Sequence, residues 1–227
     1  MLYLYTMRFI LIFCFLLFFA KSLAQKKELA HYKEDQFYID INFPLQINTI
    51  DNFKQNGFSR SLHLGFLHDI ALNDTGSHAF AIGFGYGFMR LVNNLNIRRD
   101  AGQYVYRFPT NGIDLRNAFS THQLQLPIEL RWRSSTPETY AFWRIHLGYR
   151  LSYQFAERYK PFFGSSFALD NQLTPWQHSV SLVVGYNTWN IRLAYGLSSF
   201  LRDEIRTQQA IKPLFYPVQM GLIFYLL

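Results

Sequence analysis

Apolar and polar residues alternate along most of the chain, and the segment from residue 36 to residue 48 shows the pattern plainly. Phe37, Ile39 and Ile41 share one face of an extended chain there, whereas Tyr38 and Asp40 share the other. The same period of two residues returns in seven further segments. We therefore predict eight strands, at about residues 36–48, 58–70, 79–91, 119–132, 140–155, 176–187, 189–199 and 214–226.

The two faces of these segments indicate a barrel that crosses a membrane. Segments of about a dozen residues are longer than a soluble sandwich needs, but they fit strands tilted across hydrocarbon. Between residues 79 and 91, Phe84 and Tyr86 alternate with Gly83 and Gly85, and glycine on the polar face suits a narrow lumen. A soluble closed barrel of lipocalin type, the alternative, would turn its apolar face inward. The sequence thus predicts an all-β fold, an eight-stranded antiparallel up-and-down transmembrane β-barrel.

The connections between the predicted strands alternate between short and long. Tight connections fall near residues 73–76, 134–137 and 187–188, and the other four are about 49–57, 92–118, 156–175 and 200–213. Bacterial barrels have short periplasmic turns, longer outer loops and both termini in the periplasm. We expect this chain to have the same orientation in the outer membrane of a Gram-negative bacterium.

The N-terminal residues predict a secretory signal peptide over residues 1–24. Arg8 precedes an apolar run, residues 9–20, and Ser22 and Ala24 provide the small residues of a cleavage site. Translation could start at Met1 or Met7. Residues 25–35 would then form a short periplasmic tail, and residues 36–227 the barrel domain. The single cysteine, Cys14, lies inside the signal, so no disulfide or cysteine-ligated metal is expected in the mature chain.

Composition and charge agree with an exported barrel. The mean hydropathy is only −0.05 although 19% of the residues are aromatic, because alternating strands cancel in any average. The formal charge of +7 falls to +5 when a signal with two basic and no acidic residues is removed. Nucleic acid is excluded as a partner of an exported chain. The basic excess is expected to face outer-membrane lipid and lipopolysaccharide phosphates, or another envelope protein.

Three segments resemble a known family. Residues 121–132, THQLQLPIELRW, are similar to the "hyLeiPlllr" strand of the PorT-like outer-membrane barrels, a group named for a component of the type IX secretion system. Residues 218–225 resemble the closing strand of that family, and residues 79–88 resemble its glycine-aromatic third strand. The resemblance implies a non-enzymatic, eight-stranded outer-membrane protein tied to type IX secretion or gliding. It supplies no catalytic residue and no cofactor.

Charged side chains on the polar face predict a plugged lumen. Six of them are expected to form a lumen charge network: Asp40, Glu129, Arg131, Arg144, Arg150 and Arg192. Three histidines are expected on the same face: His63, His122 and His146. An eight-stranded lumen is only wide enough for side chains to fill it. We expect Glu129 to pair with at least one of the four arginines and the network to block ions; the alternative is a narrow conducting path or ligand pocket.

The long loops carry a second group of charges. Six basic residues are expected on the extracellular side: Arg98, Arg99, Arg158, Lys160, Arg202 and Arg206. Cations near the outer leaflet would bind lipid phosphates or an acidic partner, and the alternative is a plain solvated surface.

Two serine–histidine pairs are candidate catalytic groups. Ser120 and His122, like Ser61 and His63, stand two residues apart on one strand and are expected to point into the lumen. A lipid hydrolase would need an acid to orient the histidine, and none stands out. No histidine spacing indicates a metal site. Three hypotheses follow: a structural or interaction component, a narrow diffusion pore, and, less favoured, a lipid-modifying enzyme.

Overall fold

The computed structural model describes residues 35–47, 53–100, 103–108, 115–134, 142–170, 172–202 and 217–226. The predicted signal peptide lies outside the described residues, as does the predicted tail except for Asp35. Among the described residues, no helix is long and apolar enough to span a bilayer.

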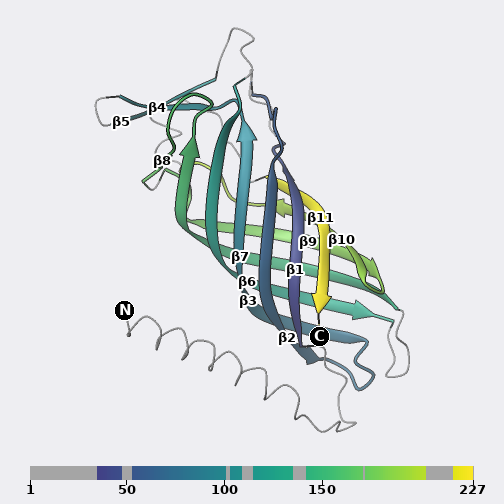
Figure 1. Ribbon diagram of the computed structural model, residues 1–227. Helices are drawn as coiled ribbons and strands as arrows, with labels where there is room; N and C mark the ends of the chain where they lie inside the picture. Colours follow the sequence, from purple (N-terminus) through teal and green to yellow (C-terminus); the bar gives the residue numbers. More distant parts are fainter. Residues whose placement is uncertain are drawn as a thin grey trace, which may run out of the picture. The chain divides into compact units, whose positions relative to one another are not determined.

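Eight strands form one closed antiparallel barrel (Figure 1). The barrel strands are β1 (Gln36–Leu45), β2 (Arg60–Ala71), β3 (His78–Asn93), β6 (Asn117–Arg133), β7 (Trp143–Lys160), β9 (Trp176–Tyr186), β10 (Trp189–Gly196) and β11 (Val218–Leu226). Each strand pairs with the next one along the chain, and β11 pairs with β1 over nine residue pairs from Phe37↔Leu226 to Leu45↔Val218. This pairing leaves the barrel sheet without a free edge, and the predicted fold class is confirmed.

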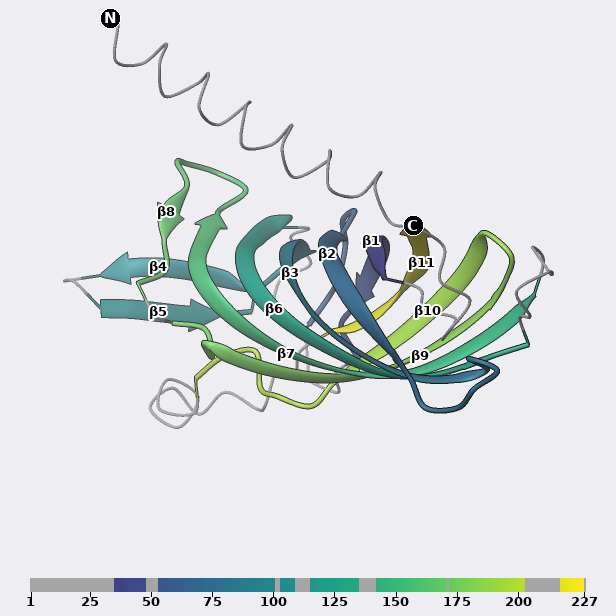
Figure 2. The same cartoon turned by 90° about the horizontal axis from the view of Figure 1, so that it is seen from below.

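Two of the predicted long loops contain further strands. β4 (Asn96–Asp100) and β5 (Gln103–Arg107) form a separate hairpin between β3 and β6. β8 (Phe167–Ala168) is a two-residue strand that pairs antiparallel with the end of β7, and β7 itself continues to Lys160. All three short strands gather at the end of the barrel opposite the tight turns (Figures 1 and 2). The sequence did not predict them because strands of two to five residues are too short to show a clear alternation.

The expected facing of the barrel strands is confirmed. Phe84 is 69% exposed and Leu193 49%, whereas Asp40 is 0% and Arg192 2% exposed. Burial alternates residue by residue along β1 and β10, as the period of two requires. The apolar face is therefore outside, where lipid satisfies it, and the polar face fills the lumen.

Glycines on β2 and β3 make room for one large side chain in the lumen. Tyr38 is 1% exposed, and a Cβ atom added to Gly85 would stand 2.2 Å from its hydroxyl oxygen. A Cβ atom added to Gly65 would stand 2.6 Å from the Tyr38 ring. The predicted role of glycine on the inner face, to clear a narrow lumen, is thus seen at Tyr38.

Replacing Gly85 by alanine is expected to destabilise the barrel by about 1–3 kcal/mol, because the new methyl group overlaps Tyr38 in a packed interior. The measurement is denaturant unfolding of the purified protein in phospholipid vesicles. Phe84→Leu, on the neighbouring lipid-facing position, is the control and should change the free energy of unfolding by under about 1.5 kcal/mol. An alanine at position 85 that is neutral would contradict this packing.

Candidate functional site

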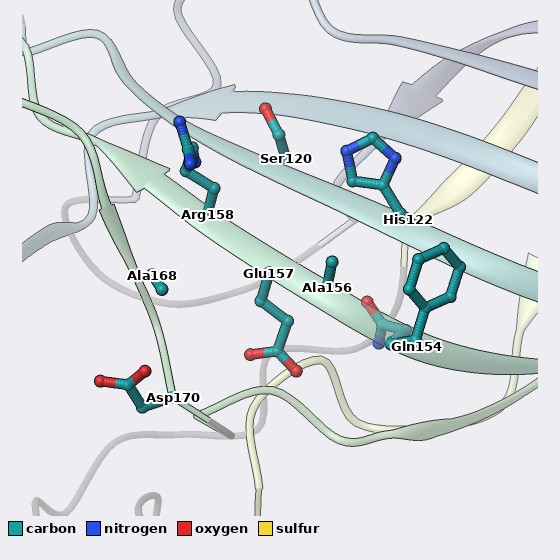
Figure 3. A pocket seen from close by; sticks show the side chains of 9 residues that line it. Ser120, His122, Gln154, Ala156, Glu157, Arg158, Ala168 and Asp170 are labelled. Atoms are coloured by element: carbon teal, nitrogen blue, oxygen red, sulfur yellow. The ribbon is translucent and has the colours of Figure 1, made fainter. Parts of the chain in front are cut away.

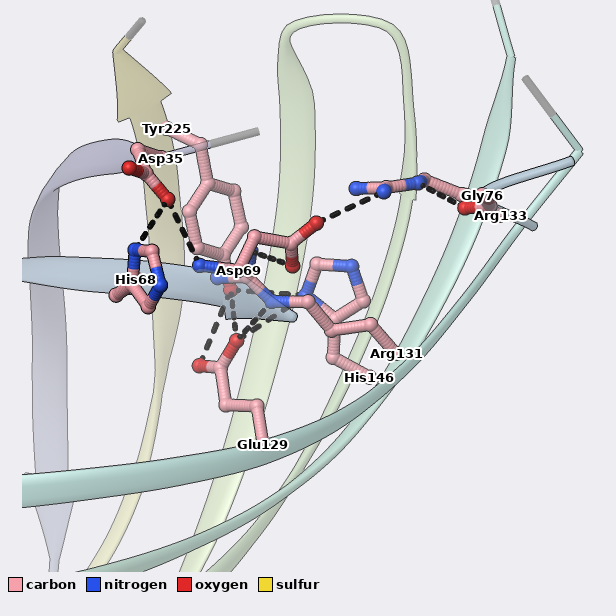
Figure 4. Close-up of polar contacts among 9 residues, drawn as sticks. All are labelled: Asp35, His68, Asp69, Gly76, Glu129, Arg131, Arg133, His146 and Tyr225. Atoms are coloured by element: carbon pink, nitrogen blue, oxygen red, sulfur yellow. Dashed lines mark hydrogen bonds and ion pairs between the residues drawn. The ribbon is translucent and has the colours of Figure 1, made fainter. Parts of the chain in front are cut away.

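A cluster of ion pairs fills the lumen near the tight-turn end (Figure 4). Arg131 donates from Nη1 to Oδ1 of Asp69 and from Nε to Oε2 of Glu129, both at 3.0 Å. Arg133 donates from Nη2 to the other oxygen of Asp69 at 2.8 Å and from Nε to the carbonyl oxygen of Gly76 at 2.7 Å. The expected pairing of Glu129 with an arginine is therefore present, and Arg131 is the partner.

Aromatic and imidazole groups complete this cluster. The Oε2 atom of Glu129 lies 3.4 Å from Nδ1 of His146, and the hydroxyl of Tyr225 donates to Oε1 of Glu129 at 3.4 Å. The guanidinium of Arg144 lies 4.5 Å from the ring centroid of Phe142 and 5.7 Å from that of Tyr225. Cation–π contacts of this kind help to hold a guanidinium in place.

Small residues on β3 let this cluster form across three strands. Ala81 stands between Asp69 on β2 and Glu129 on β6 in the strand register, and Ala79 stands beside Arg131. Both alanines are buried and leave the lumen space above them open to longer side chains. Arg131 can therefore reach Asp69 over a strand that lies between them.

Asp40 is the centre of a second group of charges in the lumen. Its Oδ2 atom lies 3.2 Å from Nη2 of Arg150 and 3.2 Å from Nη1 of Arg192, and its Oδ1 atom accepts a hydrogen bond from Asn42 at 2.8 Å. Arg150 also lies over the ring of Tyr38, 5.8 Å from its centroid. One buried carboxylate thus compensates two buried guanidinium groups.

A neutral layer lies next to Asp40, towards the long loops. Both ring nitrogens of His63 form hydrogen bonds. Nε2 lies 2.9 Å from the side-chain oxygen of Gln219, and Nδ1 lies 2.9 Å from the side-chain nitrogen of Gln125. Gln125 also donates to the side-chain oxygen of Gln123 at 3.1 Å, and Ser61 donates to Gln219 at 3.0 Å. The hydrogen bonds join β2, β6 and β11 through the lumen.

The long-loop end is closed by an apolar core that the sequence reading did not predict. Eleven buried residues form it: Met89, Leu91, Leu95, Ile97, Tyr106, Phe119, Tyr159, Leu169, Leu173, Phe200 and Leu201. They come from β3, β4, β5, β6, β7 and three connections, so the loops pack on each other rather than extend freely into solvent. Burial raises the pKa of Tyr106, whose hydroxyl donates to the side-chain oxygen of Gln172 at 2.8 Å. We call this group the cap core.

Replacing Tyr159 by phenylalanine tests the cap core. The Tyr159 hydroxyl donates to the carbonyl oxygen of Leu95 at 3.2 Å and accepts from the amide of Ile97 at 3.0 Å. Its loss leaves a buried amide and a buried carbonyl without this partner, at about 1–3 kcal/mol. Amide hydrogen exchange of residues 95–97 should accelerate, whereas exchange in β10 should stay unchanged. Unaltered protection at Ile97 would contradict the proposed contact.

The structure places five of the six predicted loop cations at the long-loop end. Arg98 and Arg99 are exposed on β4, and Arg158 and Lys160 are exposed at the end of β7. Arg202 is half-buried and donates from Nε to the carbonyl oxygen of Leu173 at 3.1 Å. The sixth, Arg206, lies outside the described residues. Their expected role in binding lipid phosphates or an acidic partner stays a prediction.

Ser120 and His122 were expected to point into the lumen, and this was wrong. Both are half-exposed on the outer side of β6, where Ser120 pairs in register with Arg158. The reason is parity: His122 lies two residues from Leu124, which is 58% exposed, so the two share a face. The hydroxyl of Tyr86 forms a hydrogen bond with Nδ1 of His122 at 2.5 Å, and the ring centroid of Phe88 lies 5.2 Å from that of the imidazole.

A hollow of about 650 Å³ lies beside these two residues (Figure 3). Ser120, His122 and Arg158 project on one side of the ribbon and Glu157 on the other. No hydrogen bond joins Ser120 to His122 in the described part of the chain, and Oε2 of Glu157 accepts from the amide of Leu173 at 3.1 Å. The groups of a serine–histidine–acid triad are therefore not assembled here. The described residues also contain no group of three or more side chains that could hold a metal ion.

Sequence reasoning missed two members of the ion-pair cluster, Asp69 and Arg133. Asp69 lies two residues from Leu67 on the inner face of β2, so the same alternation that located His63 would have located it. Arg133 is the last residue of β6, one position beyond the predicted strand end. Both residues lie near the end of a predicted strand, where strand boundaries are the least reliable part of a sequence-based prediction.

A closed sheet with an apolar exterior and an ion-paired interior defines a membrane-spanning β-barrel. A family model described as "Outer membrane protein beta-barrel domain" matches residues 24–202, and the chain belongs to this family. It is therefore an outer-membrane barrel protein. Neither the curated proteins nor the solved structures contain a match to the chain.

Proposed function

We propose that this protein is a non-conducting and non-enzymatic barrel that serves as a structural or interaction component of the outer membrane. The filled interior carries this proposal. Two groups of ion pairs, a layer of glutamines with His63, and the cap core follow each other through the described lumen. A lumen filled with side chains would leave an ion no open path, whereas its rigid wall can present loops and turns to partners.

Planar-bilayer recording tests this proposal. The purified wild-type protein should give no stepwise conductance, while a general diffusion porin in the same bilayer gives open channels. Steady, voltage-independent conductance of the wild type would instead favour the alternative of a narrow diffusion pore. Permeating ions would then have to pass the layers around Asp40 and Glu129, and substitutions in these layers would change the ion selectivity of the barrel.

The lack of an assembled triad supports the non-enzymatic part of the proposal. Hydrolysis of a fluorescent phospholipid or lipopolysaccharide analogue should not exceed the rate of empty vesicles. If activity appears and Ser120→Ala abolishes it while Ser61→Ala does not, the lipid-modifying alternative holds and the proposal fails.

We further propose that the barrel takes part in type IX protein secretion or gliding, with both termini in the periplasm. The similarity of residues 121–132 and 218–225 to the PorT-like barrels supports this assignment. Affinity purification of the detergent-extracted barrel should recover envelope proteins of the secretion machinery. A deletion strain that secretes type IX cargo and glides like its parent would contradict it, without bearing on whether the barrel conducts ions.

A further inference from the structure

Three arginines lie in one line of register partners on the outer surface of neighbouring strands. Arg60 on β2 is the register partner of Arg90 on β3, Arg90 is the partner of Ser120 on β6, and Ser120 is the partner of Arg158 on β7. Each faces out, because the residue next to it in the chain is buried in the interior: Ser61, Met89 and Tyr159 are at most 2% exposed. We call Arg60, Arg90 and Arg158 the arginine row.

The arginine row occupies only one side of the barrel. The outward positions of β1, β10 and β11 are all apolar or aromatic, and those of β9 add only His178. On the side of the row, the next outward residues toward the middle of the barrel are Leu62, Phe88 and His122. The charges therefore form a local patch above an apolar wall rather than a ring around the whole barrel.

Among the described residues, no carboxylate forms an ion pair with the arginine row. None of the ion pairs between described residues includes Arg60, Arg90 or Arg158; Arg60 lies over the ring of Phe58, 6.0 Å from its centroid. Arg60 and Arg90 are direct cross-strand neighbours, and like charges in such a pair repel each other. The nearby carboxylates are engaged elsewhere: Asp170 accepts from the hydroxyl of Tyr104 at 2.8 Å, and Glu157 points to the other side of β7 (Figure 3).

The depth of the row matches lipid headgroups. The 12 residues of β2 from Arg60 to Ala71 rise about 28 Å along the barrel axis, at about 3.3 Å per residue and a tilt of about 40°. The apolar band of an outer-membrane barrel is about 25 Å tall. Arg60 thus lies just beyond the hydrocarbon, where phosphate groups are found, and Arg90 on the adjacent strand lies within about 3 Å of that depth.

We propose that the arginine row is a binding site for the phosphate groups of membrane lipids, with the acyl chains packed on the apolar wall around Leu62 and Phe88. Guanidinium groups bind phosphate in a bidentate manner, and the Ser120 hydroxyl stands between two of them as a further donor. With the long loops outside the cell, the lipid is the phosphorylated glycolipid of the outer leaflet. The site does not depend on the proposed role in secretion.

Lipid retention by the purified barrel tests the site. The full-length protein is placed in phosphatidylcholine nanodiscs that contain a small fraction of diphosphoryl lipid A, or the same glycolipid without its phosphates, and bound glycolipid is counted by native mass spectrometry. The wild type should retain the diphosphoryl form and not the dephosphorylated form. The variant Arg60→Gln/Arg90→Gln/Arg158→Gln should retain at least about tenfold less, since each basic residue near a membrane surface strengthens anion binding severalfold.

A control of equal charge comes from the exposed hairpin of β4 and β5, because under this proposal the hairpin cations form the plain solvated surface that is the alternative to phosphate binding. Arg98→Gln/Arg99→Gln/Arg107→Gln removes three cations from the same end of the barrel and should keep retention within about twofold of the wild type. The lysine variant of the row should bind at an intermediate level, because an ammonium group cannot bind phosphate in a bidentate manner. Folding of every variant is checked by the heat-dependent shift of the barrel on gels.

Two results would overturn the proposal. Equal retention of phosphorylated and dephosphorylated glycolipid by the wild type would show that phosphate is not recognised. Equal weakening by the hairpin variant and the row variant would show that net charge, rather than this row, attracts the lipid. If the glutamine row variant fails to fold, Arg90→Gln alone is used, and unchanged retention by it and by the lysine variant would equally contradict the site.

Discussion

Replacing Asp40 by asparagine is expected to lower the free energy of unfolding by about 3–5 kcal/mol, because it leaves two buried guanidinium groups without their carboxylate. Asp40 is 0% exposed, and it is the only carboxylate within ion-pair distance of Arg150 and Arg192 among the described residues. Asparagine keeps the volume and the position of the side chain, so packing changes little. The measurement is denaturant unfolding in phospholipid vesicles, followed by tryptophan fluorescence.

Two further variants separate this effect from a general loss of negative charge. Asp74→Asn removes a carboxylate from an exposed tight turn and should change the free energy of unfolding by at most about 0.5 kcal/mol. Asp40→Asn combined with Arg192→Leu removes one of the stranded cations and should recover part of the loss. If Asp40→Asn is as mild as Asp74→Asn, the ion pairs at Asp40 do not hold the lumen together.

The alternation of residue types predicted which charges lie inside the barrel but not how they pair. Asp40, Glu129, Arg150 and Arg192 were placed in the lumen by parity alone, and parity needs no three-dimensional information. The pairing of Asp40 with Arg150, 110 residues away, depends on the stagger of strands around the barrel. No local pattern encodes that stagger, since it results from the pairing of all eight strands together.

The cap core shows a second limit of the sequence reading. Met89, Leu91, Leu95 and Ile97 are apolar at alternate positions, but they were assigned to the end of a strand and a solvated loop. The sequence alone does not show that three connections meet over one barrel end, where these residues bury each other.

The position of His122 was predictable, in contrast to the ion pairs. Its spacing of two residues from the lipid-facing Leu124 fixes its face, and the prediction of a lumen position disregarded this parity. The aromatic side chains of Tyr86, Phe88 and Phe155 around it are what an interfacial position of a membrane barrel contains. Residues on a strand are therefore safer to assign by their parity than by their chemistry.

The lipid-facing wall gives the second large effect. Leu193 is 49% exposed on β10, and its register partners Leu182 and Met220 are also outward and apolar. Trp189, four residues earlier, marks the tight-turn rim of the same strand, so Leu193 lies well inside the apolar band. Leu193→Arg should therefore destabilise the barrel by about 2–4 kcal/mol, because a guanidinium near the midplane is withdrawn from water without a partner.

Depth and facing provide the controls for Leu193→Arg. Ile47 is 68% exposed just beyond the long-loop end of β1, and Ile47→Arg should cost only about 0–1 kcal/mol because interfacial arginines reach water. A spin label at position 193 should be accessible to oxygen dissolved in lipid, and one at the buried Ser152 should not. Because Leu193 and its neighbour Arg192 point to opposite sides of one strand, a label at 193 that reports water would mean that the whole strand is turned, with Arg192 in hydrocarbon rather than beside Asp40.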